Sequence, residues 1–299
     1  MNLYILTQAL LLPIIYTGIE KERLKLIFLW EVIVIMIDQN LSREIQNWIQ
    51  QEVDKRNADG AVIGLSGGID SSVVAALSKK ALGDNVLGVM LPANGTINKD
   101  VEYAEKLADK FNIETLKVNM KEINEPLENR LKNIDIKETE REHWPQTKIP
   151  TPNPAEQNIQ TRLRMMTLYY IAEKKNYVVM GTSNKSEMLT GYFTLYGDGA
   201  TDMRPIGDLN KTQVWELAEI LGVPEKIINR PPTGGCRGDE SDRDEKEFGI
   251  SYEDFDQIYE SINNNDDLSK FEKGDVKRVR ELIDAAKEKD HVPMFKIAE

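Results

Sequence analysis

The chain has 299 residues, 40 % of them hydrophobic, which allows a large globular core and excludes a disordered or fibrous protein. Its formal net charge of -12, from 38 basic and 50 acidic side chains, argues against a nucleic-acid partner. One cysteine and two histidines provide neither an internal disulfide nor a Cys/His zinc site, and we expect a reducing, cytoplasmic location.

Two strongly apolar windows open the chain, at residues 3–15 and 26–37. Both are short for a helix that crosses a bilayer, so we expect no membrane partner. The first window lacks a basic region and a clear cleavage site, yet a poor signal segment or a helix on a membrane surface stays open as an alternative. We assign residues 1–37 to an apolar extension and residues 38–299 to one domain.

A competing hypothesis places the start of translation at Met36, because the residues that follow are typical of the opening of a soluble domain. Ser42 is a suitable helix N-cap, and apolar residues then recur along one helical face. These are Ile45, Trp48, Ile49 and Val53. Under this hypothesis residues 1–35 do not belong to the native protein.

Short apolar runs alternate with helical stretches from residue 61 onward, the pattern of a parallel sheet covered on both faces. Strands are expected at residues 61–65, 86–91, 114–118 and 177–181. Helices are expected at residues 71–81, 98–111, 154–175, 209–221, 252–263 and 273–289. We therefore predict an α/β fold, doubly wound, with a mostly parallel five-stranded sheet and helices on both faces.

Two segments have loop composition. Residues 133–154 contain four prolines towards their end, which cannot continue a helix. Residues 230–247 are rich in proline, glycine and charge, with no periodicity. The first is expected to be a long loop, and the second either a solvated loop or a lid over a site.

The segment "GLSGGIDS" joins the first expected strand to a helix. Ser66, Gly67, Gly68 and Ser71 can present backbone N–H groups, hydroxyls and a helix N-terminus to one point, an arrangement that binds phosphate. No lysine follows the glycines as in a Walker A loop, and their spacing does not fit a dinucleotide fingerprint. Asp70 beside bound phosphates predicts Mg²⁺ between them, while a first-turn aspartate that only complements the helix dipole is the simpler alternative.

Other polar residues are expected at the same edge of the sheet. Thr182 and Glu187 follow the fourth expected strand, where ligands bind in doubly wound folds. A glycine-rich stretch then carries Asp198, Asp202 and Lys211 into a helix. Together these residues indicate a nucleotide and metal site.

Five further ordered stretches give the sequence a family resemblance. They are "NIQTRLRM", "GTSNKSE", "GYFTLYGDGATD", "PIGDLNKTQV" and "DEKEFGISYEDFD". With the loop at residues 64–71, which is similar to that of the N-type ATP pyrophosphatases, they resemble the ammonia-dependent NAD synthetases over roughly residues 41–255. The resemblance implies an adenine nucleotide alpha hydrolase-like fold.

The resemblance also implies an activity. Such enzymes amidate nicotinic acid adenine dinucleotide (deamido-NAD) with ammonia, and release AMP and pyrophosphate through an acyl adenylate. The implied metal ligands for Mg²⁺ are Asp70 and Glu187, and Arg162 and Asp202 are implied contacts to deamido-NAD. We also consider Asp202 as acceptor of the ammonium proton, and the family implies a homodimer. The implied ATP contacts are Gly64, Leu65, Ser66, Gly67, Gly68, Ile69, Asp70, Ser71, Thr182, Lys211 and Thr233, with Lys211 as the cation on phosphate.

The sequence departs from the family at Leu195, where many members carry lysine, at Lys289-Asp290-His291 before Pro293, and in residues 234–242. A paralogue that amidates another carboxylate therefore stays open, as do a tRNA-acting ligase and a non-catalytic nucleotide-binding module. A glutaminase domain would need more sequence than precedes residue 41 or follows residue 255. Free ammonia, or ammonia from a separate glutaminase, is the expected nitrogen source.

Overall fold

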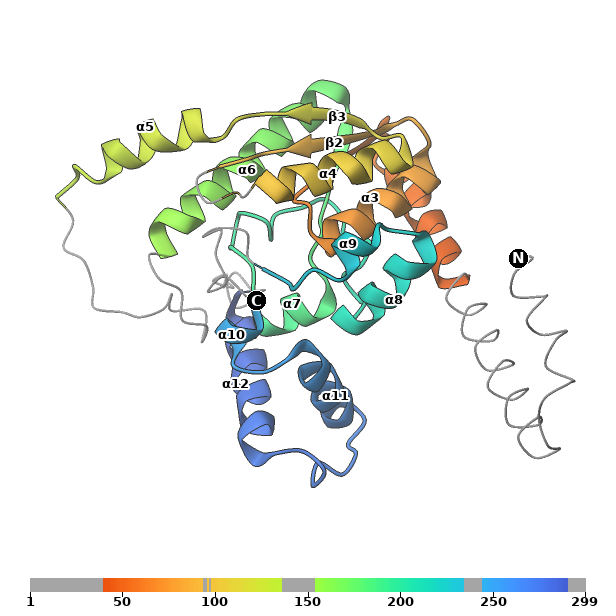
Figure 1. Ribbon diagram of the computed structural model, residues 1–299, viewed down its shortest axis with the longest axis vertical. Coiled ribbons are helices and arrows are strands. Elements are labelled where there is room, and N and C mark those ends of the chain that lie inside the picture. Colours follow the sequence, from red (N-terminus) through yellow and green to blue (C-terminus); the bar gives the residue numbers. More distant parts are fainter. Residues whose placement is uncertain (1–39, 94–95, 97, 136–153, 234–243, 290–299) are drawn as a thin grey trace, which may run out of the picture. The chain divides into compact units, whose positions relative to one another are not determined.

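The computed structural model describes residues 40–93, 96, 98–135, 154–233 and 244–289. Our expectations for residues 1–37 and for most of the loop at 133–154 lie outside these residues. The same is true of residues 234–243 within the second loop. Elements are labelled as in Figure 1.

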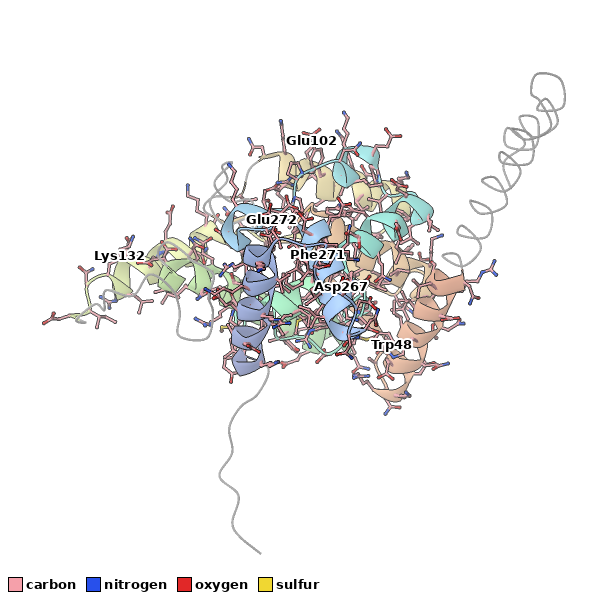
Figure 2. All side chains as sticks on the ribbon, turned by 90° about the horizontal axis from the view of Figure 1, so that it is seen from below. Trp48, Glu102, Lys132, Asp267, Phe271 and Glu272 are labelled. Carbon is pink, nitrogen blue, oxygen red and sulfur yellow. The ribbon has the colours of Figure 1, made fainter. Side chains whose placement is uncertain are left out.

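A helix over residues 40–55 precedes the sheet. Ile45, Ile49 and Val53 form its buried face, as their spacing predicts. Two details differ from expectation. Ser42 lies inside this helix and not at its N-cap, and Trp48, labelled in Figure 2, is 38 % exposed.

Four parallel strands form the sheet within the described residues, in the order β3-β2-β1-β4. They are β1 (Gly60–Gly64), β2 (Val86–Met90), β3 (Glu114–Lys117) and β4 (Tyr177–Met180), each within two residues of its expected place. The α/β fold class is thus confirmed, and the number of strands is corrected from five to four. Beyond β4 only an isolated bridge forms, between Met180 and Met203. Pro205, which has no N–H, follows in a turn, so the ladder does not extend.

Helices cover both faces of the sheet. Helices α3 (Ile69–Leu82) and α4 (Asn98–Phe111) lie on one face, and α6 (Pro154–Lys175) lies on the other (Figure 1). On the α6 side, Val62 and Val179 of neighbouring strands are buried in one cluster with Ala172 of the helix. Both faces of β1 and β2 are therefore buried, as expected for parallel strands.

The strand order places the site. From β1 the chain proceeds outward to β2 and β3, and it then returns to add β4 on the opposite side of β1. In doubly wound folds the crevice for ligands opens at such a reversal, beyond the carboxyl ends of the strands. The two segments that leave this point are the loop before α3 and the segment that leads to α7 (Lys185–Thr190).

Four helices were not expected from periodicity. They are α5 (Lys121–Leu131), α7, α9 (Glu225–Ile228) and α10 (Asp244–Phe248). Helix α5 has Pro126 inside it and buries only Asn124, because its apolar residues Ile123, Leu127 and Leu131 lie on one face that stays exposed. Helices α7, α9 and α10 are too short for a periodic pattern to emerge. Helix α10 also corrects our expectation of a loop as far as residue 247.

The remaining helices form a second hydrophobic cluster. Helices α11 (Tyr252–Asn263) and α12 (Lys273–Lys289) pack together through Phe255, Ile258 and Leu282. These three residues and the other buried apolar residues between positions 248 and 282 form what we call the C-terminal cluster. Leu189 of α7 and Trp215 of α8 (Lys211–Leu221) pack against it. The C-terminal helices therefore rest on the two helices that begin at the site. Among the described residues, none of the helices combines the length and apolarity that crossing a membrane requires.

Candidate functional site

The loop between β1 and α3 is tightly organised. The hydroxyls of Ser66 and Ser71 lie 3.0 Å apart, and the Ser66 hydroxyl accepts a hydrogen bond from the Gly68 N–H at 3.2 Å. Ser71 in turn donates to the Gly68 carbonyl at 3.0 Å. Gly67 has a φ of +78°, and an added Cβ would overlap the carbonyl oxygen of Asp100. Both the conformation and the close approach require glycine at position 67.

A cavity of about 400 Å³ opens beside this loop. Most of the expected site residues line it. They are Gly64, Leu65, Ser66, Gly68, Ile69, Asp70, Ser71, Arg162, Thr182, Glu187, Lys211 and Thr233. Gly67 and Asp202 are not among the lining residues.

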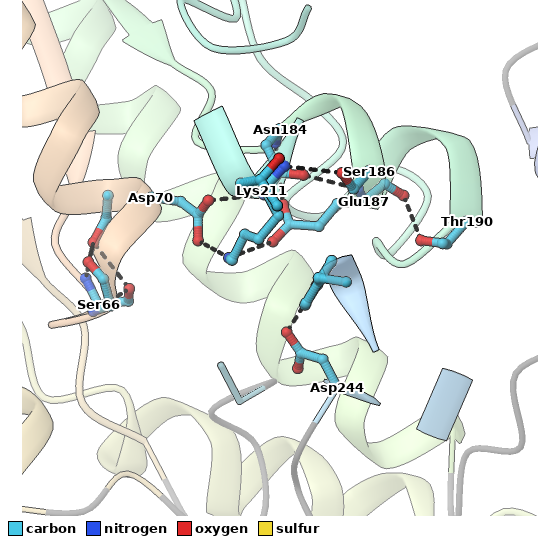
Figure 3. Close-up of polar contacts among 12 residues, drawn as sticks. Ser66, Asp70, Asn184, Ser186, Glu187, Thr190, Lys211 and Asp244 are labelled. Atoms are coloured by element: carbon cyan, nitrogen blue, oxygen red, sulfur yellow. Dashed lines mark hydrogen bonds and ion pairs between the residues drawn. The ribbon is translucent and has the colours of Figure 1, made fainter. Parts of the chain in front are cut away.

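Three charged side chains that line the cavity, Asp70, Glu187 and Lys211, meet at one point (Figure 3). The Lys211 ammonium lies 2.5 Å from Asp70 Oδ2 and 3.6 Å from Glu187 Oε1. Asn184 Nδ2 donates to Asp70 Oδ1 at 2.8 Å. The sequence thus brings two distant acids to one buried cation, at the edge of the sheet where they were expected.

Local capping fixes the start of both supporting helices. Asn184 accepts a hydrogen bond from the Glu187 N–H at 2.9 Å, and Glu187 Oε2 accepts one from the Asn184 N–H at 3.2 Å. This capping box leaves Glu187 Oε1 facing Lys211. Gln213 accepts from the Asn210 N–H at 2.9 Å in the same way, so that Lys211 opens α8 with its side chain buried.

Burial and excess negative charge perturb these groups. Burial raises the pKa of Glu187 well above its ordinary value, and repulsion from Asp70 adds to the rise. Burial alone would lower the pKa of Lys211, but attraction to Asp70, Glu187 and Asp244 outweighs it and raises that pKa. Two carboxylates contact one ammonium and Asp244 acts on it from farther away, so negative groups outnumber the cation at this point.

Asp244, which opens α10, was not expected at the site, although it stands in one of the family-like stretches. It lines the cavity, and Tyr252 donates its hydroxyl hydrogen to Asp244 Oδ2 at 3.0 Å. Burial raises the pKa of Asp244 to about 6, although attraction to Lys211 opposes the rise. The Lys211 ammonium lies 5.1 Å from the centre of the Tyr252 ring, a cation–π distance.

Asp202 has a different environment from the one expected. Its Oδ2 accepts from the Val179 N–H of β4 at 2.7 Å, and its Oδ1 accepts from the Tyr169 hydroxyl at 3.2 Å. Both carboxylate oxygens are therefore engaged behind the cavity wall. The described geometry ties the loop to the sheet through Asp202 and does not bring its carboxylate to the cavity.

Three arginines, Arg162, Arg164 and Arg230, line the cavity. Arg162 of α6 donates from Nε to the Leu195 carbonyl at 3.2 Å. Arg230 forms an ion pair of 2.5 Å with Asp100 of α4, just before the segment that carries Thr233. The pair is largely buried, with 18 % and 9 % of the two side chains exposed, so it fixes that segment at the cavity.

Lys289, at the end of α12, also lines the cavity. Its ammonium donates to the carbonyls of Gly191 and Phe193, both at 2.6 Å. Burial lowers the pKa of Lys289 to about 8 against attraction to Asp198. Although the sequence departs from the family pattern at this position, Lys289 still places an amino group at the cavity.

The donor set suits Mg²⁺. Magnesium in nucleotide sites uses one or two carboxylates together with phosphate oxygens and waters. Asp70 and Glu187 supply two carboxylates beside the loop, and no cluster of three or more metal-ligating side chains occurs among the described residues. The site can thus hold a triphosphate on the loop and share a divalent cation with it.

Comparison with sequences gives consistent matches. Residues 41–293 match the family model described as NAD synthase. The chain is 39 % identical over 254 residues to the NH(3)-dependent NAD(+) synthetase of Carboxydothermus hydrogenoformans, covering 85 % of this chain and 97 % of that protein. It is 40 % identical over 230 residues to the protein of the same name from Finegoldia magna, covering 77 % and 87 %.

Comparison with solved structures gives the same fold. NMN synthetase from Francisella tularensis superposes with a TM-score of 0.74 and 29 % identity, covering 87 % of this chain and 98 % of that one. The NH3-dependent NAD synthetase from Campylobacter jejuni superposes with a TM-score of 0.70 and 28 % identity, covering 87 % and 99 %.

Proposed function

The chain belongs to the NAD synthase family, and from this we propose that it is a ligase that converts deamido-NAD and ammonia to NAD with ATP as co-substrate. The carboxylate of deamido-NAD attacks the α-phosphorus of ATP, a new C–O–P linkage forms, and pyrophosphate leaves. Ammonia then attacks the acyl carbon, and AMP leaves with the former carboxylate oxygen. The amide nitrogen loses its extra proton as the C–N bond forms.

One observation carries this proposal: the loop at residues 65–68, two acids and one lysine converge on a single cavity. A carboxylate is a poor acyl donor at neutral pH, and its adenylate supplies a leaving group. The charge that develops on pyrophosphate must be neutralised where it forms. A pre-positioned ammonium and the hydroxyls of Ser66 and Ser71 at the cavity suit that task.

The chain's own residues take the following roles. Ser66, Gly68 and Ser71 hold the triphosphate through hydroxyl and N–H groups. The Lys211 ammonium exchanges part of its contact with Asp70 and Glu187 for a contact with a phosphate oxygen. Thr182 and Thr233 contact ATP from the other walls of the cavity. The loop takes its backbone conformation and its fit around ATP from the remaining residues, Gly64, Leu65, Gly67 and Ile69.

We propose Mg²⁺ as the metal, held by Asp70 and Glu187. When bound, it neutralises phosphate charge and orients the triphosphate. The position of these two carboxylates beside the loop supports this assignment, because a divalent cation there would stabilise their ionised forms next to phosphate.

For deamido-NAD, we propose Arg162 as a contact, because it lines the same cavity as the loop. We assign Asp202 a supporting role, since both of its oxygens bind within the protein. Leu195 lines the cavity and offers no cation there, and its carbonyl positions Arg162. Specificity for the carboxylate substrate then depends on the other residues around it.

We also propose a homodimer. Residues 45–53 and residues 159–170 carry apolar side chains at helical spacing, so both helices are candidates for its interface. The first buries its apolar face within the chain, whereas Met166 and Tyr170 of α6 are 60 % and 64 % exposed. The neighbouring helix α5 exposes Ile123 as well. An exposed apolar area on adjacent helices favours α5 and α6 as the interface. A cytoplasmic location completes the proposal and rests on the sparse cysteine content.

The test is an assay of products with ATP, Mg²⁺, ammonium and deamido-NAD. We expect NAD, AMP and pyrophosphate in equal amounts, and ADP would contradict the site of cleavage. A parallel reaction with nicotinic acid mononucleotide covers the alternative that the likeness to NMN synthetase raises. Efficient formation of NMN with little NAD would overturn the assignment to deamido-NAD.

A further inference from the structure

A buried carboxylate outside the cavity joins the two helices that carry Glu187 and Lys211. Asp256 of α11 is 3 % exposed, and it is absent from the cavity lining. Its Oδ1 accepts from the Ser186 hydroxyl at 2.5 Å, in the first turn of α7. Its Oδ2 accepts from Thr212 in the first turn of α8, both from the N–H at 3.2 Å and from the hydroxyl at 3.1 Å.

The Ser186 hydroxyl accepts a hydrogen bond as well as donating one to Asp256. Its Oγ accepts the backbone N–H of Lys211 at 3.0 Å. Ser186 directly precedes Glu187, and Thr212 directly follows Lys211. The backbone positions of both charged residues therefore depend on hydrogen bonds that lead to the carboxylate of Asp256.

Asp256 itself is held by a rigid element. Its neighbours Tyr252, Phe255 and Ile258 on α11 are at most 1 % exposed and belong to the C-terminal cluster. Tyr252 also packs edge-on against Trp215 of α8. The carboxylate thus has a fixed place from which to hold the two first turns.

We propose that Asp256 is a positioning residue that sets the separation between the Glu187 carboxylate and the Lys211 ammonium, and so tunes the affinity for ATP. The inference rests on the proposed function, because it assigns ATP to the cavity. Three donors converge on Asp256, and an ionised carboxylate accepts all of them. An asparagine amide offers one accepting oxygen and turns an N–H₂ group towards the remaining donors.

A purely structural role predicts a different outcome. If Asp256 only stabilised the fold, its replacement would lower the melting temperature and leave the affinity of the folded protein for ATP unchanged. The two roles are therefore separated by binding measurements at a temperature where every variant is folded.

The experiment compares Asp256→Asn with Asp254→Asn by calorimetric titration with ATP, with and without Mg²⁺. Asp254 lies on the same helix and is exposed, and among the described residues its carboxylate hydrogen-bonds to Ser251, so it is a matched control. We expect Asp256→Asn to raise the Kd for ATP by about tenfold, a change on the scale of one charge-assisted hydrogen bond, and Asp254→Asn to leave it within twofold. The KM for ammonium should stay within twofold in both.

Ser186→Ala provides a second route if Asp256→Asn does not fold. It removes the link to the Lys211 N–H and leaves Thr212 bound to Asp256, so we expect a smaller rise in Kd, of about threefold. Unchanged ATP affinity in the folded variants would overturn the positioning role alone. A wild-type protein that binds no ATP would overturn both this inference and the proposed function.

Discussion

Gly67→Ala tests whether the loop depends on a backbone that only glycine can adopt. At a φ of +78°, an L-residue costs about 1–2 kcal/mol. The added Cβ would also overlap the Asp100 carbonyl oxygen and lie 2.9 Å from the carbonyl carbon. Overpacking of this kind adds about 1–3 kcal/mol, because the neighbour is backbone and cannot rotate away. The free energy of unfolding should fall by about 2–5 kcal/mol.

The assay is urea unfolding with a matched control, Gly83→Ala. Gly83 caps the other end of α3 with a φ of +60°, and an added Cβ there meets nothing within 4 Å. The control therefore carries a conformational cost alone, about 1–3 kcal/mol, because its ψ of -125° lies outside the left-handed helical region. Any larger loss in Gly67→Ala reports the contact with Asp100, which adds about 1–3 kcal/mol.

Binding gives a second measure of the same perturbation. A displaced loop misaligns its donors, so Gly67→Ala should weaken ATP binding while Gly83→Ala leaves it unchanged. Equal losses of stability in the two variants, together with equal ATP affinity, would refute the close packing of the loop on α4.

Three further results are expected. Lys211→Met should lower kcat/KM for ATP by about 100-fold to 1,000-fold in steady-state kinetics, because no ammonium then meets the developing charge; a loss under tenfold would contradict its role. Burial raises the pKa of Asp244 in the folded protein to about 6, so ionisation of this carboxyl above pH 4 costs stability. As the pH rises from about 4 to about 6, the free energy of unfolding of the metal-free wild type should therefore fall by up to about 3 kcal/mol relative to that of Asp244→Asn. Parallel pH curves in denaturant unfolding would count against this burial. Tyr170→Glu should shift sedimentation towards monomer, because it places a charge on the exposed face of α6; an unchanged dimer would move the interface elsewhere.

Much of the sheet and loop could be predicted from the sequence because their signals are local. The apolar runs of β1, β2 and β4 are continuous, and the carboxyl ends of parallel strands meet by geometry. Asp70 and Glu187 could therefore be placed at one edge of the sheet from the sequence alone. The capping box at Asn184 also has a local signal, since its residues are close together in the sequence.

Site residues that depend on long-range packing could not be predicted from the sequence. Asp244, Asp256 and Lys289 reach the site or its supports only because the C-terminal helices pack against α7 and α8. Nothing local in their sequence specifies that packing. For Asp202 the motif predicts a substrate contact, whereas long-range pairing brings its carboxylate to the Val179 N–H.

The prediction of a fifth strand is wrong for a physical reason. The stretch around Met203 approaches β4, but it forms a single bridge before a turn that contains Pro205. Hydrophobic pattern alone does not show where a ladder stops.

The central claim is that the cavity joins a carboxylate to the α-phosphorus of ATP before ammonia arrives. It is tested most directly with deamido-NAD labelled with ¹⁸O in both carboxylate oxygens. Our account predicts one labelled oxygen in AMP, one in the amide of NAD and none in pyrophosphate, as read by mass spectrometry. Unlabelled AMP, or label in pyrophosphate, would contradict it.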